Sequence, residues 1–278
     1  MGLVLFAFFV LVLFKWFAEV FLEKLNQNYA KTHAGEKLPE ENSVEQEKKK
    51  TLEYTLAKSN YSIIETTFST LVLLLIVFAG FLPWFYSLVI GYWGDSVWAH
   101  GGYLFSLILL GTIITMPFEW YYQFVLEERF GFNTTTQKLW WNDRFLMLVI
   151  SLILIYPFLV FIIAVARWAG DDWWIWVWLG VMVYQLLMVL IVPKFIMPLF
   201  YKFQPLPENS LREKIERIAE QSGVAVKSIT VMDGSKRSKH SNAFLSGLGK
   251  FKKIALFDTL VEQMEEDEIV AVVAHEIG

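Results

Sequence analysis

Hydrophobic residues in this chain are gathered into five long runs, and polar segments separate them. The runs cover residues 3–22, 62–82, 98–117, 145–166 and 173–192. An α-helix needs about 20 mainly apolar residues to cross the hydrocarbon core of a bilayer. The pattern therefore predicts five membrane-spanning helices. The first run has neither a basic n-region nor a small-residue cleavage site, so we expect it to be a retained helix and not a signal peptide.

The polar segments between the runs differ in charge, and this difference predicts an orientation. Segment 23–61 carries seven lysines and segment 118–144 carries three basic residues, whereas segment 83–97 has neither Lys nor Arg. Basic residues are enriched in cytoplasmic loops. We therefore expect cytoplasmic loops at 23–61 and 118–144, a cytoplasmic segment after residue 193, and an N-terminus on the outer or lumenal side.

The pattern changes after residue 193 to that of a folded domain with both helices and strands. Residues 208–222 place apolar side chains on one helical face, and a second helical run begins near Glu265. Short apolar runs at 228–232 and 253–257 are typical of strands. The fold class predicted for the chain is an α-helical polytopic membrane protein. Residues 1–192 form its membrane region, and residues 193–278 begin a cytoplasmic α+β domain.

Composition supports the membrane assignment and limits the chemistry. Hydrophobic residues make up 55% of the chain and charged residues 19%, whereas a soluble domain has about 45–50% and about 25%. The net charge of −4 gives no reason to expect a nucleic-acid partner, while the five runs imply a lipid bilayer as partner. Because the chain has no cysteine, any bound metal must be held by histidines and carboxylates.

One pair of residues near the end of the second helical run suggests such a metal site. His275 and Glu276 are followed by Ile277 and Gly278. In the zincin motif H-E-x-x-H, two histidines on one helical face bind Zn²⁺, and the glutamate deprotonates the metal-bound water. The chain supplies the first histidine, the glutamate and the two spacers. A His-Glu pair by itself is also common as a surface or core feature, but the apolar residues before it suit a buried catalytic helix.

Several segments of the chain together resemble the type-I CAAX prenyl protease family of integral-membrane zinc metalloproteases. The segments occur in the order of the family, from the second run to the end of the chain. They are Glu127–Thr136, Pro198–Phe203 with Pro205-Leu206, Lys236–Phe244, Lys253–Leu260 and Ala274–Gly278. The resemblance implies membrane helices around a water-filled chamber, closed by a zincin-type protease domain. Members of the family have seven spans, of which five are expected here.

The resemblance also implies roles for particular residues. His275 would be the first zinc ligand and Glu276 the catalytic general base, with a second histidine and a distal glutamate ligand in a C-terminal segment beyond Gly278. The chain as given is then expected to be inactive alone. Asn242, Ala243 and Phe244 match the stretch that leads into a substrate-binding edge strand. The alternative for Asn242 is a turn residue between strands, and His240 is expected to be an exposed loop residue.

Three functions remain open from the sequence. The first is a zinc endopeptidase that cleaves C-terminal residues from prenylated protein or peptide substrates. The second is a related quality-control protease in the bacterial inner membrane or the endoplasmic reticulum, acting on unprenylated membrane proteins. The third is a non-catalytic membrane scaffold or transporter, which would need no His-Glu helix.

Overall fold

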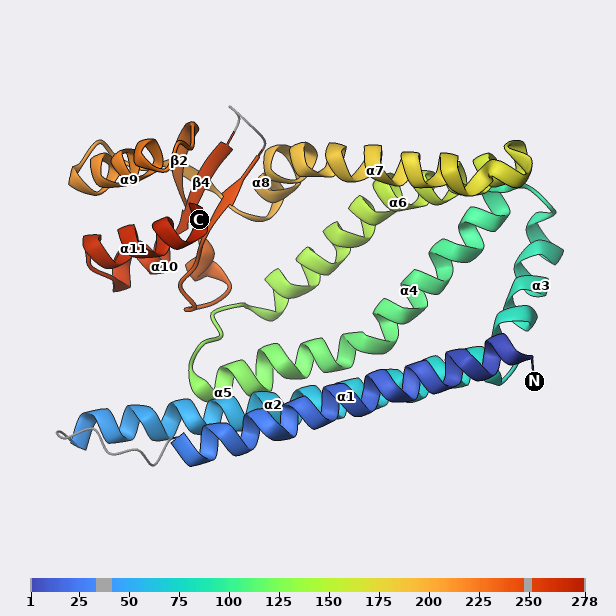
Figure 1. Cartoon of the computed structure of the whole chain (residues 1–278), viewed down its shortest axis with the longest axis horizontal. Coiled ribbons are helices and arrows are strands. Elements are labelled where there is room, and N and C mark those ends of the chain that lie inside the picture. Colours follow the sequence, from blue (N-terminus) through green and yellow to red (C-terminus); the bar gives the residue numbers. More distant parts are fainter. Residues whose placement is uncertain (1, 34–41, 248–251, 278) are drawn as a thin grey trace. The chain divides into compact units, whose positions relative to one another are not determined.

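The computed structural model describes residues 2–33, 42–247 and 252–277 (Figure 1). The chain divides into two compact units, Met1–Phe130 and Gly131–Gly278. The predicted division between a membrane region and a soluble domain at 192/193 stays a prediction.

The first unit consists of helices. Helix α1 packs along α2, and α3 contacts both α2 and α4. A short π-helical segment, η1, continues α4 into α5. The bounds are α1 Leu3–His33, α2 Asn42–Phe78, α3 Phe81–Trp93, α4 Val97–Tyr121, η1 Tyr122–Glu127 and α5 Glu128–Phe130.

The second unit begins with a pair of long helices that pack on each other and continues into a small sheet covered by further helices. Its helical elements before the sheet are α6 Gln137–Trp168, the 3₁₀ turn η2 Gly170–Asp172, α7 Trp173–Ile191, the π-helical segment η3 Val192–Ile196 and α8 Met197–Phe200. The rest comprises β1 Phe203–Pro205, α9 Ser210–Gln221, β2 Val226–Met232, the 3₁₀ turn η4 Gly234–Lys236, β3 Ala243–Ser246, β4 Lys252–Phe257, α10 Asp258–Gln263 and α11 Glu266–Ile277.

The prediction of five membrane helices is confirmed in the described part of the chain. Five helical stretches are long and apolar enough to cross a bilayer: Leu3–His33, Lys48–Phe78, Val97–Phe130, Gln137–Trp168 and Gly170–Phe200. Each extends beyond its apolar run at one end or both, because polar residues continue the helix there. The expected loops 23–61 and 118–144 are therefore largely helical where the structure describes them.

The segment after the second span differs from the prediction. The apolar run was expected to continue to residue 82, but α2 ends at Phe78, and α3 follows where a loop was expected. Gly80 has a φ of 76°, a backbone conformation that glycine adopts without steric cost. The break at this glycine, followed by Pro83 in the first turn of α3, divides one apolar run into two helices.

A buried polar network joins α1 to α2. Gln27 and Ser59 are only 5% and 7% exposed. The Gln27 amide nitrogen donates to the Ser59 hydroxyl at 3.0 Å and to the Asn60 side-chain oxygen at 2.9 Å. The Ser59 hydroxyl in turn donates to the Glu23 carboxylate at 2.6 Å. Buried polar groups are costly unless they are paired, and here each pairs across the helix interface.

Within the described residues, the sheet has four strands in the order β1-β2-β4-β3. Strand β4 pairs with β2 in parallel and with β3 in an antiparallel arrangement, while β1 pairs with β2 in an antiparallel arrangement. Residues 254–256 of β4 are all buried, as expected for a central strand with both faces covered. The strands predicted at 228–232 and 253–257 are therefore confirmed, with two further strands added at the edges.

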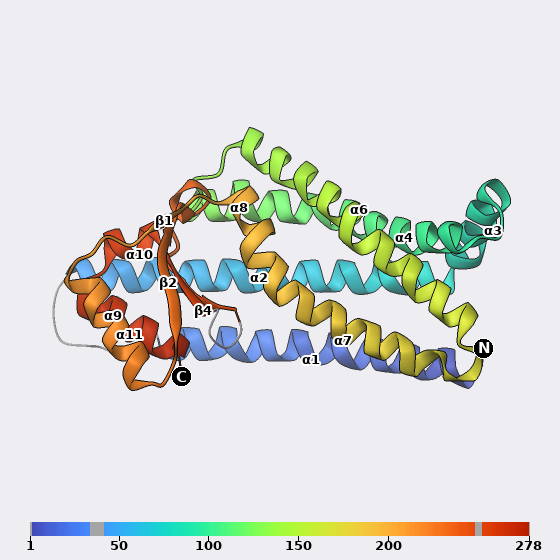
Figure 2. The same ribbon diagram turned by 90° about the horizontal axis from the view of Figure 1, so that it is seen from above.

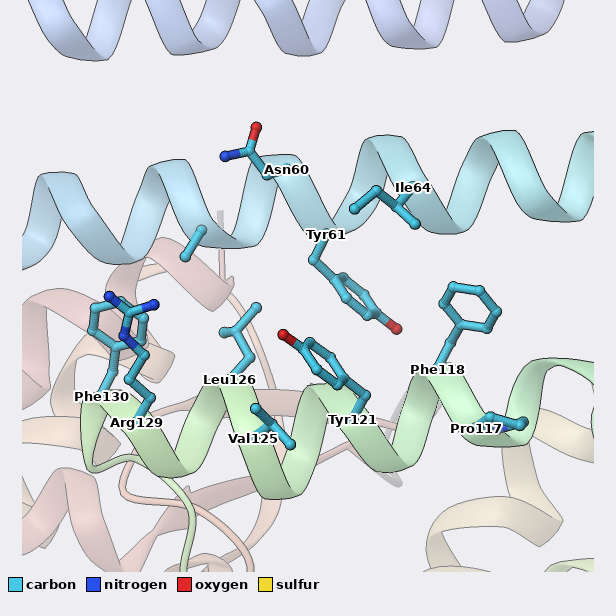
Figure 3. Close-up of a pocket in the computed structure, with 11 residues that line it drawn as sticks. Asn60, Tyr61, Ile64, Pro117, Phe118, Tyr121, Val125, Leu126, Arg129 and Phe130 are labelled. Carbon is cyan, nitrogen blue, oxygen red and sulfur yellow. The ribbon is translucent and has the colours of Figure 1, made fainter.

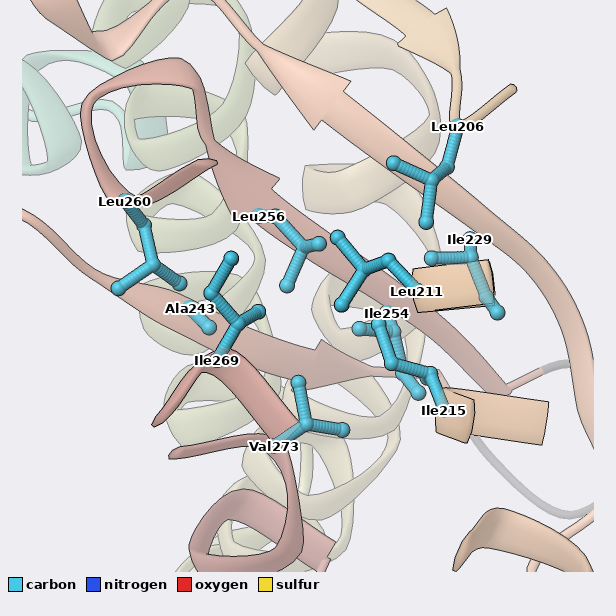
Figure 4. Close-up of a cluster of buried hydrophobic side chains, with 10 residues drawn as sticks. All are labelled: Leu206, Leu211, Ile215, Ile229, Ala243, Ile254, Leu256, Leu260, Ile269 and Val273. Carbon is cyan, nitrogen blue, oxygen red and sulfur yellow. The ribbon is translucent and has the colours of Figure 1, made fainter. Parts of the chain in front are cut away.

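The core of the second unit lies between the sheet and helices α9, α10 and α11 (Figure 4). Helices α9 and α11 lie side by side over one face of the sheet (Figure 2). Helix α9 confirms the predicted amphipathic pattern, and Gly223 follows it with a φ of 67°. The buried side chains of the cluster are Leu206, Leu211, Ile215, Ile229, Ala243, Ile254, Leu256, Leu260, Ile269 and Val273.

The tight packing around Gly234 leads to a first prediction. A Cβ atom at this position would overlap the Phe257 ring and lie 3.0 Å from its Cγ atom, near the root of the side chain. Overpacking of this kind costs about 1–3 kcal/mol. We expect Gly234→Ala to lower the thermal unfolding midpoint of the purified protein. Gly111→Ala is the matched control, since a Cβ atom at Gly111 meets nothing within 4 Å. An unchanged midpoint for Gly234→Ala would contradict the packing described here.

Candidate active site

Helix α11 carries the two residues that the sequence singles out for metal chemistry. Ile269 and Val273, one turn apart, are each 1% exposed and face the core. His275 and Glu276, in the last turn of the helix, are exposed. The buried residues of the helix thus anchor it in the core. Its exposed residues present an imidazole and a carboxylate to a ligand. Gly278 lies outside the described residues.

The start of α11 is fixed to α9 by polar contacts. Lys214 on α9 forms ion pairs with Glu266 at 3.0 Å and Asp267 at 2.7 Å. The Ser210 hydroxyl donates to Glu266 at 2.5 Å. This hydrogen bond and the Lys214 ammonium lower the pKa of the Glu266 carboxyl. The acidic residues of this first turn therefore bind a neighbouring helix, in addition to favouring the helix dipole.

Strand β3 packs against α11 and lies at one edge of the sheet. It contains two of the three residues predicted to contact substrate, and their side chains face opposite ways. Ala243 is 2% exposed and belongs to the core beneath the helices. Phe244 lines a cavity of about 130 Å³ on the other face of the sheet, together with residues of the segment 193–203. What β3 can offer to a peptide beside α11 is therefore its backbone.

Asn242, the third predicted residue, lies directly before β3. Its main-chain carbonyl accepts a hydrogen bond from the Phe257 amide at 3.0 Å, and its side-chain oxygen accepts one from the Ala243 amide at 2.8 Å. These bonds shape the entry of the chain into the strand. A role for Asn242 as a turn residue and a role in substrate binding both stay predictions.

The described residues do not complete a metal site. Nowhere in residues 2–33, 42–247 and 252–277 do three His, Asp or Glu side chains lie close enough to hold one ion. His275 can supply one imidazole ligand, and Glu276 a carboxylate beside it. The donor chemistry suits zinc, but the number of ligands does not suffice.

A group of contacts that no sequence pattern indicated holds the loop before β3. We name it the Arg237 clamp: residues Phe132–Thr135 and Asp143 on one side, and Ser235–His240 on the other. Arg237 donates two hydrogen bonds to the Asp143 carboxylate, at 2.8 and 2.9 Å. His240, expected as an exposed loop residue, is exposed and stacks its ring on Phe132 at 4.4 Å between centroids.

The first unit contains a separate cavity of about 480 Å³ between α2 and the α4–η1–α5 segment (Figure 3). Its lining is mostly apolar. Tyr61 and Tyr121 project into the space between the helices, with their rings parallel and their centroids 6.2 Å apart. The cavity contains neither of the two candidate metal-site residues.

Five membrane helices joined to a sheet-and-helix domain define a multi-pass integral membrane protein, and its domain presents a His-Glu pair on an exposed helical face. The chain belongs to the CAAX prenyl protease family. Residues 27–202 match the N-terminal region of CAAX prenyl proteases, described as five membrane helices, and residues 205–278 match peptidase family M48. The resemblance seen in the sequence segments is thereby confirmed.

Individual relatives agree with the family assignment. The CAAX prenyl protease 1 homolog of Arabidopsis thaliana is 38% identical over 244 residues, covering 84% of this chain and 58% of the relative. CAAX prenyl protease 1 of Saccharomyces cerevisiae is 44% identical over 179 residues, covering 63% of this chain and 39% of the relative. The crystal structure of S. mikatae Ste24p matches with a TM-score of 0.85 and 32% identity, covering 97% of this chain and 65% of that one. The chain thus spans less than two thirds of the length of these relatives.

Proposed function

We propose that this protein is a membrane zinc endopeptidase that cleaves near the C-terminus of protein or peptide substrates. The observation that carries the proposal is the placement of His275 and Glu276 on the exposed face of α11, beside the edge strand β3. Membership of the M48 peptidase family supports it. The same two observations count against a scaffold or transporter, which would need neither residue.

Each residue of the site has a separate role in this proposal. His275 is a zinc ligand, and Glu276 accepts a proton from the attacking water. The backbone of β3 pairs with an extended substrate, a recurring mode of peptide recognition. Zinc, when bound, supplies Lewis-acid polarisation of the scissile carbonyl. The described residues do not bring three ligands together at His275. Following the family resemblance, we propose that a second histidine and a distal glutamate supply the missing ligands.

The substrate and the orientation are also proposals. We infer prenylated C-terminal peptides as substrates, because the eukaryotic relatives in plant and yeast are named CAAX prenyl proteases. Activity on unprenylated membrane proteins is the alternative. The lysine-rich segment 23–61 and the basic residues of 118–144 support a cytoplasmic location for both segments and for the α11 domain.

Metal removal and substrate comparison test the proposal together. The full-length protein, purified in detergent, is assayed on a farnesylated C-terminal peptide and on the same peptide without the lipid. We expect cleavage that a chelator abolishes and that one equivalent of zinc restores, with a clear preference for the farnesylated peptide. Equal cleavage of both peptides would favour the alternative substrate class. Absence of cleavage at full zinc occupancy would contradict the peptidase assignment.

A further inference from the structure

We propose that the Arg237 clamp positions the edge strand β3 for substrate binding, with Arg237 as its central positioning residue. The inference rests on the proposed function, since it assumes that β3 pairs with an extended peptide. The clamp residues are proposed to act on the substrate indirectly, through the backbone of β3, and not by contact with the substrate or with α11.

The ion pair at the centre of the clamp has the geometry of a strong interaction. The Nε and Nη2 atoms of Arg237 approach the two carboxylate oxygens of Asp143 at 2.8 and 2.9 Å. Such bidentate pairing fixes orientation as well as distance. The two side chains are only 15% and 25% exposed, and the guanidinium lies 4.5 Å from the Tyr201 ring centroid. Burial acts to lower the pKa of Arg237, but the hydrogen bonds and charge of Asp143 outweigh it and raise the pKa overall.

Main-chain and hydroxyl contacts extend the clamp on both sides of the ion pair. The Lys239 amide donates to the Phe132 carbonyl at 3.0 Å, and Asn133 pairs with Ser238 in an antiparallel bridge. The hydroxyls of Thr134 and Thr135 donate to the carbonyls of Ser235 and Arg237 at 2.7 and 2.9 Å. The loop before α6 thus holds Ser235–His240 through one isolated antiparallel bridge and these hydrogen bonds.

The clamped segment leads directly into β3. On its other side it is held by the start of α10, where the Asp258 carboxylate accepts from the Ser235 amide at 2.8 Å and Thr259 donates to the His240 carbonyl at 3.1 Å. Strand β3 itself is paired on one edge, with β4. Its first residues are therefore located by β4, by α10 and by the clamp. A substrate strand bound to the outer edge would be sensitive to small displacements of this backbone.

A purely stabilising role and a positioning role differ in what they change. Helix α11, with His275 and Glu276, also packs on β3, but the core and the ion pairs with α9 hold it without direct help from the clamp residues. Loosening the clamp should therefore weaken peptide binding while the chemistry of bound peptide continues. KM is then expected to rise while kcat stays nearly constant. This is the pattern seen when the lost interaction stabilises the bound substrate and the transition state by the same amount. A loss of folded protein alone would leave KM unchanged.

The decisive experiment measures KM and kcat of the full-length protein with Arg237→Gln and Asp143→Asn. We expect each variant to raise KM about tenfold with kcat within about twofold, and the double variant to add little more. Arg212→Gln is the matched control: it removes an arginine that bonds to Glu216 at 2.9 Å on α9, away from β3, and should leave both constants unchanged. A wild-type KM with a reduced folded fraction would overturn the positioning role.

Two further measurements extend the test, and the first of them depends neither on protein yield nor on the peptidase assignment. Hydrogen exchange of the Ala243–Ser246 amides should become faster in Arg237→Gln and not in Arg212→Gln, whether or not the protein cleaves peptides. The chain has no cysteine, and Asn133 and Ser238 occupy facing positions in the bridge. An Asn133→Cys/Ser238→Cys disulfide added to Arg237→Gln should restore KM when oxidised and lose this effect on reduction. Unchanged exchange in β3, or no recovery on oxidation, would refute the proposal.

Discussion

Replacement of Glu276 by glutamine in the full-length protein is expected to lower kcat for peptide cleavage at least about a hundredfold, within the range that general base catalysis contributes. Glutamine keeps the size of the side chain but cannot accept a proton. Because Glu276 is exposed, the change leaves no buried group without a partner and should not alter the unfolding temperature. Zinc content is expected to stay at the wild-type level, because the proposed ligand is His275.

Cleavage rate and zinc content must be measured on the same preparation to interpret this result. Glu262→Gln is a suitable control, since it removes another exposed carboxylate from the neighbouring helix α10. It should cleave at the wild-type rate. Turnover by Glu276→Gln within a few fold of wild type would show that Glu276 is not the general base. Loss of zinc from this variant would show that Glu276 is a zinc ligand.

Truncation of Leu256 to alanine is expected to lower the free energy of unfolding by about 2–5 kcal/mol, the cost of deleting a buried leucine side chain. Leu256 is 0% exposed and lies on the central strand β4, within the cluster beneath α9 and α11. Buried side chains of α9, α10, α11 and the neighbouring strands surround it, so the truncation leaves a cavity inside the cluster.

Hydrogen exchange of the β4 amides, followed in increasing denaturant, measures this loss, since all twelve tryptophans lie at or before residue 178 and do not report on the cluster. Met264→Ala truncates a side chain that is 37% exposed and serves as control, with an expected change within about 0.5 kcal/mol. If Leu256→Ala were as stable as the control, the cluster would not be the core of this unit.

Local patterns explain why the membrane helices could be predicted. A run of about 20 apolar residues is a property of the sequence alone, and each of the five runs supplies most of a helix long enough to cross a bilayer, although the run 62–82 is divided at Gly80. The ends of the helices were harder to predict. The break at Gly80 depends on the backbone conformation of a single residue. A hydropathy pattern does not reveal this break, because the residues on both sides of it are apolar.

The two edge strands, in contrast to the membrane helices, could not be predicted from a local sequence pattern. Strand β1 has three residues and includes Pro205, so no local preference marks it as a strand. It forms because residues 203–205 pair with residues 230–232 of β2. Strand β3 was implied only by the family resemblance, since its four residues lie in a stretch that reads as a polar connection.

The candidate site was predictable to the extent that its chemistry is local. His275 and Glu276 are neighbours, so a motif could identify them. Arg237 and Asp143 are 94 residues apart, and no charge pattern links them. Likewise, the side of the sheet that Phe244 faces follows from the register with β4, which the sequence does not reveal.

The network around Gln27 also determines how α1 and α2 align along their length. Most of their interface is apolar, and apolar contacts alone would tolerate a slide of one helical turn, about 5.4 Å. In one direction, such a slide would place the Gln27 amide opposite Ile63 and Ile64 in place of Ser59 and Asn60. The amide would then lose its acceptors in a buried setting, at a cost of several kcal/mol. The glutamine therefore disfavours this alternative register of the two helices, much as a single buried asparagine does in a coiled coil.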